Sequence, residues 1–211
     1  MKNRVIAGDF GKQKLTKMRK VGGSRKVNDE QRGRRNLTHQ EVELICKAIR
    51  AGSRYPDRDE TMVLMAFHHG LRISELTNIK YQRINLKTQQ VSVKRLKNGI
   101  DSLHPISSKR EMMLLRRLYK ASGRPLSGDV FVNERGSGVT TDGFRKMFTK
   151  FSLKALGIKW NPHALRHGCG TTLIERGVGI RQLQVYLGHR NIQNTTQYLH
   201  ESSKQFEGIE W

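Results

Sequence analysis

The chain has 211 residues, of which 40 are Lys or Arg and 18 are Asp or Glu, so its formal net charge is +22. This length suits one domain and a short extension, and the charge favours a polyanionic partner. Aromatic residues make up only 7% of the chain, which argues against a protein that binds single strands by base stacking. Duplex DNA is therefore the expected partner.

Membrane and secretory segments are not expected. No apolar run approaches the roughly 20 residues that a membrane span requires, and the basic N-terminus lacks the apolar stretch of a signal peptide. The two cysteines, Cys46 and Cys169, have no metal-ligand spacing between them. We expect reduced thiols in a cytoplasmic protein.

Residues 1–36 form the first segment of the chain and are strongly basic. They hold twelve Lys or Arg against three acidic residues, a net charge of +9, and show little apolar periodicity. We expect a flexible arm ahead of a single domain at 37–211. The arm is either a solvated tail or a segment that becomes ordered on DNA phosphates.

Two helices should follow the arm. Thr38 and Glu41 have the spacing of a capping box ahead of an apolar periodic run. The second helix contains residues 62–67 and ends at Gly70.

Arg72 stands just beyond this helix, in Gly70-Leu-Arg-Ile-Ser-Glu75. It is either an ordinary helix-start residue paired with Glu75 or a cation that binds an anion.

A three-stranded element is predicted at 83–86, 91–96 and 103–106, with an Asn-Gly turn at 98–99. Helices are expected at 111–120 and 140–156, with a short strand at 130–132 between them. Three basic residues lie together on the second of these helices: Arg145, Lys146 and Lys150. This face is either simply solvated or enters the DNA major groove.

The last fifty residues carry the motifs of most interest. Asn161-Pro162 introduces a helix that contains His163 and Arg166, and four glycines should divide the rest of the chain into short helices: Gly170, Gly177, Gly179 and Gly188. Leu187-Gly-His189 comes next, and Tyr198 stands nine residues after His189. The fold class should be α+β, mainly helical, with a small three-stranded antiparallel sheet.

Two simpler interpretations compete with a catalytic one. His163 and His167 stand at i and i+4, as a zinc pair would, but no third ligand has suitable spacing and the sequence is not HExxH. A single Tyr near a C-terminus is ordinarily a packing or surface residue. The fixed order and spacing of all these motifs together favours chemistry.

From about Leu37 to its end, the chain resembles the tyrosine recombinases of the phage integrase family. The pattern of that family is an Arg after Gly-Leu, a Lys in a β-turn, HxxR, Gly-His, and a Tyr nine residues later. The resemblance implies six catalytic residues: Arg72, Lys97, His163, Arg166, His189 and Tyr198. Lys97 is placed by counting eight residues back from Pro105, and its neighbours Lys94 and Arg95 are expected to face the DNA backbone.

Phosphoryl transfer explains these residue types. A scissile phosphate needs preorganised cations, and the planar guanidinium groups of Arg72 and Arg166 suit its oxygens. The resemblance implies that Tyr198 attacks phosphorus and forms a 3′-phosphotyrosyl link. His163 would accept its proton, His189 would donate a hydrogen bond to the phosphate, and Lys97 would protonate the departing 5′ oxygen. Glu75 would fix an arginine by a salt bridge, and no metal or cofactor is expected.

The short layout looks like that of the fimbrial-switch DNA invertases, without a separate N-terminal core-binding domain. The implied activity is site-specific recombination of duplex DNA through a Holliday junction, as a homotetramer on synapsed sites. Inversion, integration and excision stay open, as does a need for accessory DNA-bending proteins. We expect the chain to be encoded by a bacterium or a phage and to act at the nucleoid of a bacterial cell. The alternatives are a catalytically silent DNA-binding regulator and a type IB topoisomerase.

Overall fold

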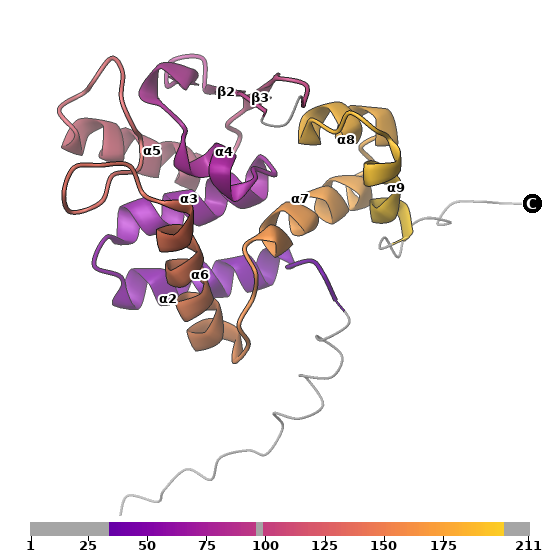
Figure 1. The fold of residues 1–211 in the computed structure, drawn as a ribbon, viewed down its shortest axis with the longest axis horizontal. Coiled ribbons are helices and arrows are strands. Elements are labelled where there is room, and N and C mark those ends of the chain that lie inside the picture. Colours follow the sequence, from indigo (N-terminus) through magenta and orange to yellow (C-terminus); the bar gives the residue numbers. More distant parts are fainter. Residues whose placement is uncertain (1–33, 96–98, 201–211) are drawn as a thin grey trace, which may run out of the picture. The chain divides into compact units, whose positions relative to one another are not determined.

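The computed structural model describes residues 34–95 and 99–200 (Figure 1). Contacts divide the chain into two units, Met1–Arg34 and Arg35–Trp211, and every described element belongs to the second. The helices are α2 (His39–Gly52), α3 (Pro56–His68), α4 (Ile73–Thr77), α5 (Lys109–Ala121), α6 (Thr141–Leu156), α7 (His163–Glu175), α8 (Ile180–Leu187) and α9 (Gln193–His200). The strands are β1 (Ile84–Asn85), β2 (Gln90–Val93) and β3 (Ser102–Pro105), with a 3-10 helix η1 (Tyr81–Arg83) before β1. The α+β fold class is confirmed.

Helix α2 begins where the sequence predicts. The Thr38 hydroxyl accepts a hydrogen bond from the Glu41 backbone N–H at 3.3 Å, and the Glu41 carboxylate accepts one from the Thr38 N–H at 2.9 Å. This reciprocal capping box satisfies donors that a helix start otherwise leaves unpaired. The apolar face of α2 is buried through Val42, Ile45 and Ile49.

Helix α3 is the centre of the main core. Residues 59–67 are all buried, because α2, α5, α6 and α7 all contact this helix. Figure 1 shows α3 between α2 and α5. The carboxylate of Glu60 is buried there and pairs with Arg50 of α2 and Arg110 of α5. A buried carboxylate without cationic partners would strongly destabilise the fold, so this network fixes how the three helices pack.

The sheet is antiparallel in the order β1-β2-β3. Ile84 pairs with Val91 across the first ladder, and Val91 pairs with His104 across the second. Val91 and Val93 are both buried while Ser92 between them is only half-buried, which is the alternation expected of a sheet with one covered face. The three predicted strands are confirmed; β1 and β2 are shorter than predicted, and β3 has the predicted length but begins one residue earlier.

The predicted strand at 130–132 is wrong. This segment makes only isolated bridges, Lys80 with Asp129 and Val132 with Gly138. Phe131 between them is fully buried in the core. Val130 is buried as well, whereas Val132 is 37% exposed. The backbone pairs with a different partner on each side, so no ladder extends along the segment.

Helices α7 and α8 are followed by left-handed glycines, as the sequence suggests. Gly177 comes after α7 with φ 81°, and Gly188 ends α8 with φ 66°, a conformation that glycine adopts without steric cost. Gly170 does not end a helix, contrary to prediction, but lies within α7. A second cluster forms where α7, α8 and α9 meet; it contains Cys169, Leu183, Leu187 and Tyr198.

Both cysteine side chains are unpaired and buried. Burial raises the pKa of the Cys46 and Cys169 thiols to about 12, so both are protonated at neutral pH. Among the described residues, no helix has the length and apolar content that a membrane span requires.

Candidate active site

Glu75 organises the first part of the site. Arg72 precedes α4, and Glu75 in the first turn accepts a hydrogen bond from the Arg72 backbone N–H at 2.9 Å. The same carboxylate pairs with the Arg72 guanidinium at 2.7 Å. Burial alone would raise the pKa of Glu75, but hydrogen bonds from Arg72 and Arg95 lower it below its ordinary value. Glu75 therefore holds the Arg72 side chain, which stays 28% exposed.

Arg166 approaches the same carboxylate from α7. Its guanidinium donates to the backbone carbonyls of Gly70 and Leu187, the latter at 2.8 Å, and Nη1 lies 4.0 Å from Glu75 Oε2. Burial and the neighbouring cations Arg72 and Arg95 lower the pKa of Arg166 to about 10. Arg166 thus stays charged at neutral pH, and two arginines from distant parts of the chain share one site.

His189 lies beside these cations. Its Nδ1 is 2.9 Å from the Thr195 hydroxyl oxygen. Burial, followed by the charges of Arg166 and Arg72, lowers the pKa of His189 to about 3. The ring is therefore neutral at working pH and carries one N–H.

Tyr198 packs parallel to His189. Their ring centroids are 6.4 Å apart with an interplanar angle of 4°, and Tyr198 is 1% exposed. A Cβ atom on Gly170 would lie 2.6 Å from a ring carbon of Tyr198, so only glycine leaves room there. The glycine within α7 is thus explained by the aromatic ring that it accommodates.

His163 and His167 complete the site from the first two turns of α7. The two imidazole rings are 5.0 Å apart, and the His167 ring is 5.8 Å from that of Tyr198. Partial burial and neighbouring charges lower the pKa of both histidines. In the part of the chain that the structure describes, no group of three His, Cys, Asp or Glu side chains is arranged to hold a metal.

From the sequence, His167 is recognised only as half of a possible zinc pair, and its place beside the tyrosine is missed. Nδ1 of His167 is buried and makes no hydrogen bond to the described residues. The i, i+4 spacing from His163 was the available signal, since it places both rings on one face of a helix.

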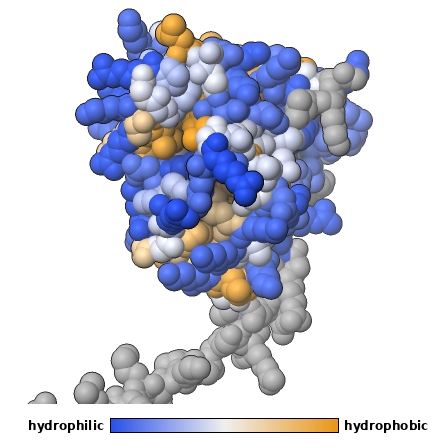
Figure 2. Space-filling view, turned by 60° about the vertical axis from the view of Figure 1, so that its left-hand side comes forward, coloured by the Kyte–Doolittle hydropathy of each residue, from blue (hydrophilic) through white to orange (hydrophobic). Residues whose placement is uncertain are grey.

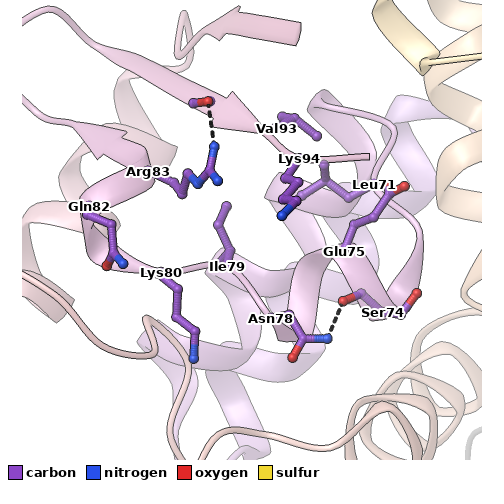
Figure 3. A pocket seen from close by; sticks show the side chains of 11 residues that line it. Leu71, Ser74, Glu75, Asn78, Ile79, Lys80, Gln82, Arg83, Val93 and Lys94 are labelled. Atoms are coloured by element: carbon purple, nitrogen blue, oxygen red, sulfur yellow. Dashed lines mark hydrogen bonds between the residues drawn. The ribbon is translucent and has the colours of Figure 1, made fainter. Parts of the chain in front are cut away.

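Lys97, the predicted lysine of the site, lies outside the described residues. Lys94 is exposed and lines a cleft of about 200 Å³ between α4, η1 and β2 together with Arg83 and Glu75. Figure 3 shows Lys94 and Arg83 reaching into this cleft, with Arg83 hydrogen-bonded to Ser92 at 3.3 Å.

Arg95 does not face the DNA backbone, and that expectation is corrected. Its side chain is 0% exposed and donates to Glu75 at 2.8 Å. The alternation of side chains in β2 continues past its end at Val93, since Lys94 is exposed and Arg95 is buried. The buried carboxylate of Glu75 gives the inward guanidinium its partner.

The basic residues of α6 lie on the surface. Arg145, Lys146 and Lys150 are all exposed, whereas Phe144, Phe148 and Phe151 of the same helix are buried. Lys146 pairs with Asp142 at 2.8 Å, a contact that water and salt would weaken. Figure 2 shows a face on which hydrophilic side chains cover most of the surface.

Known proteins resemble this chain in sequence and in fold. Residues 35–205 match the model of the phage integrase family. The type 1 fimbriae regulatory protein FimE of Escherichia coli strain K12 is 34% identical over 180 residues, which cover 83% of this chain and 90% of FimE.

Two solved structures share the fold at lower identity. The XerA recombinase has a TM-score of 0.69 at 24% identity and the XerH recombinase bound to palindromic difH substrate one of 0.68 at 18%. The alignments cover 81% and 82% of this chain, but only 61% and 51% of those chains. The predicted resemblance is confirmed: the chain belongs to the phage integrase family, the tyrosine recombinases, which break and rejoin DNA strands.

Proposed function

We propose that this chain recombines duplex DNA at specific sites through a covalent link to Tyr198 and a Holliday junction. One observation carries the proposal. Arg72, Arg166, His189 and Tyr198 come from parts of the sequence up to 126 residues apart, yet they meet around Glu75 and the α7–α9 cluster. No packing requirement would gather two arginines beside a tyrosine and a neutral histidine.

The two arginines have the properties needed to bind a scissile phosphate. Arg166 is held from two sides by backbone carbonyls, and Arg72 is held by Glu75 while part of its guanidinium stays accessible. Charges that are fixed before the reaction stabilise developing negative charge without reorganisation, and one such donor is worth about 3–4 kcal/mol of barrier.

His189 suits the role of a neutral hydrogen-bond donor. If the Thr195 hydroxyl donates to Nδ1, the single ring proton of neutral His189 resides on Nε2. That N–H is then available to a phosphate oxygen. Thr195 would thereby select the tautomer that the reaction needs.

The covalent step exchanges one phosphoester for another. The Tyr198 oxygen bonds to phosphorus while the bond from phosphorus to the 5′ oxygen breaks, and the DNA keeps a 3′-phosphotyrosyl link. The phenolic proton passes to a neutral imidazole, His163 as predicted or His167, which lies between His163 and the tyrosine ring. Lys97 would supply the proton that the departing 5′ oxygen takes up.

Tyr198 is buried in this structure, so its hydroxyl needs a path to the phosphate. Helix α9 is eight residues long and packs on α7 and α8. A displacement of α9 when DNA binds would open that path.

Lys94 and the basic residues of α6 would bind the phosphates on either side of the cleavage site. The active form would be a homotetramer on synapsed sites. Accessory DNA-bending proteins would assist where the sites require them. We propose that the protein acts in the cytoplasm at the nucleoid, where its DNA substrate lies.

Tyr198→Phe tests the proposal. Nicked duplexes tiled across the DNA beside its coding sequence are incubated with wild type and variant, and adducts are sought on denaturing gels. We expect an adduct with wild type only and equal DNA affinity for both, because the variant lacks only the nucleophilic oxygen. An adduct formed by Tyr198→Phe would assign the nucleophile elsewhere.

The same substrates separate recombination from the alternatives. A recombinase joins strands between two copies of the site and forms branched junctions, whereas a type IB topoisomerase relaxes supercoils with one copy. Tight, site-selective binding without any adduct would favour a silent regulator. Family membership and the intact set of catalytic residue types support the recombinase.

A further inference from the structure

We infer that Arg95 is a positioning residue for strand cleavage, because its buried guanidinium joins the chain segments that carry Arg72 and His189. This inference rests on the proposed function. Arg95 touches none of the reacting atoms, so it would act through the groups that it holds in place.

The first connection runs to Arg72. Nη1 of Arg95 donates to Glu75 Oε2 at 2.8 Å, while Glu75 Oε1 accepts from Arg72 at 2.7 Å. Glu75 is 1% exposed, so water offers it little alternative pairing. The direction in which Glu75 points, and with it the position of the Arg72 guanidinium, depends on Arg95.

The second connection runs to the turn before His189. Nη2 of Arg95 donates to the backbone carbonyl of Tyr186 in the last turn of α8. A Cβ atom on Gly188 would lie 2.6 Å from Arg95 Cγ, so the glycine of the Gly-His motif lets the arginine stem pass. His189 is the next residue in the chain.

The third connection runs through the Arg95 backbone to Asp101. The Arg95 backbone N–H donates to the Asp101 carboxylate at 2.7 Å. A Cβ on Gly99 would lie 2.7 Å from Arg95 Cβ and 2.9 Å from the Gly188 carbonyl oxygen. Arg95, Gly99 and Asp101 thus lie against one another, and Gly99 lies against the backbone of Gly188, the residue before His189.

A buried arginine is a costly way to fill space, since desolvation of the charge offsets much of its attraction to Glu75. A guanidinium does provide several donors in a fixed plane, and Arg95 uses them for Glu75, the Tyr186 carbonyl and the His69 carbonyl at 3.4 Å. A lysine has one donor atom and cannot span these partners. The arrangement therefore favours a role for Arg95 in orienting its partners over a role in stabilising the fold.

The test compares Arg95→Lys and Arg95→Met with Arg110→Met, which removes an ion pair with Glu60 and Glu43 away from the site. Single-turnover cleavage of the nicked duplex is measured at saturating protein, together with DNA affinity and thermal unfolding, at a temperature where every variant is folded. A displacement of about 1 Å in a catalytic group can cost about 100-fold in rate. We expect a loss of that order for both Arg95 variants with little change in DNA affinity, and a near-normal rate for Arg110→Met.

Arg95→Lys keeps the charge and one bond to Glu75, so it should fold even if Arg95→Met does not. Wild-type rates in the folded Arg95 variants would overturn the inference, as would a loss confined to DNA affinity. Equal rate losses in the Arg95 and Arg110 variants would reduce Arg95 to a structural residue. A wild-type chain that formed no adduct would instead contradict the proposed function, and this inference with it.

Discussion

At the scale of single residues, the two arginines of the site differ in what else they support. Arg72 is paired only with Glu75 among the described residues, and Glu75 would still have Arg95 if Arg72 were removed. Arg166 bonds to two backbone carbonyls in the interior. Arg72→Ala should therefore mainly slow strand cleavage, whereas Arg166→Ala should both slow cleavage and destabilise the fold.

We expect either substitution to slow cleavage by at least about 100-fold. Arg166→Ala should in addition lower the free energy of unfolding by about 1–3 kcal/mol, because it leaves buried carbonyl groups unpaired. Single-turnover cleavage and denaturant titration measure the two quantities. Near-normal cleavage by either variant would remove that arginine from the site.

Gly170 makes a second residue-scale prediction. In a solvent-exposed helix, Gly→Ala stabilises by about 1 kcal/mol, but here the new methyl would lie 2.6 Å from the Tyr198 ring. We expect Gly170→Ala to destabilise the fold by about 1–3 kcal/mol, as overpacking does, and to slow cleavage by moving the nucleophile. Gly179→Ala is the control, since its nearest neighbour would be 3.9 Å away. Unchanged stability and cleavage in Gly170→Ala would contradict the packing described.

At the scale of elements, sequence patterns predicted most of the secondary structure. The Thr38–Glu41 capping box and the alternating Val91 and Val93 are local signals, and local hydrogen bonds and burial bear them out. The prediction of a strand at 130–132 was wrong because the pairing of this segment depends on distant residues, Lys80 among them.

The same distinction holds for the site. Motif order predicted Arg72, Arg166, His189 and Tyr198 as site residues, but it did not predict the inward direction of Arg95, which depends on the partner that Glu75 offers. The role of Gly170 was hidden for a similar reason, because its partner Tyr198 lies on another helix. Sequence patterns therefore predict residue types well and three-dimensional neighbours poorly.

Helix α6 makes the element-scale prediction. Replacing Arg145, Lys146 and Lys150 by Gln should weaken DNA binding and reduce the slope of log affinity against log salt by up to about 3, since each phosphate that is no longer bound reduces it by about 1. Arg116, Arg117 and Lys120 of α5 are also exposed and give a control with the same charge change. Equal slopes for both triple variants would mean that α6 contributes only net charge.

At the scale of the whole molecule, buried histidines couple stability to pH. Burial, then the charges of His69 and Arg95, lowers the pKa of His104 to about 3, and that of His189 is also about 3. An unfolded histidine has a pKa of about 6.5. Between these values the unfolded chain binds more protons than the folded one, so the free energy of unfolding must fall as pH falls.

His104→Phe tests this dependence, because phenylalanine can keep the stacking on Tyr186 without titrating. Denaturant unfolding between about pH 7 and pH 4 should show a smaller pH slope in the variant, by up to about 1.4 kcal/mol per pH unit. His39→Phe, at an exposed position on α2, is the matched control. An unchanged slope in His104→Phe would show that other groups cause the acid sensitivity.

The central claim is that Tyr198 forms the covalent bond to DNA, and mass spectrometry of the trapped adduct tests it most directly. The chain has five tyrosines, and trypsin cleavage after Arg190 and Lys204 leaves Tyr198 as the sole tyrosine of its peptide. After nuclease digestion, we predict a nucleotide on this peptide, attached through a 3′ phosphate at Tyr198. A nucleotide on a peptide with Tyr55, Tyr81, Tyr119 or Tyr186 would contradict the account.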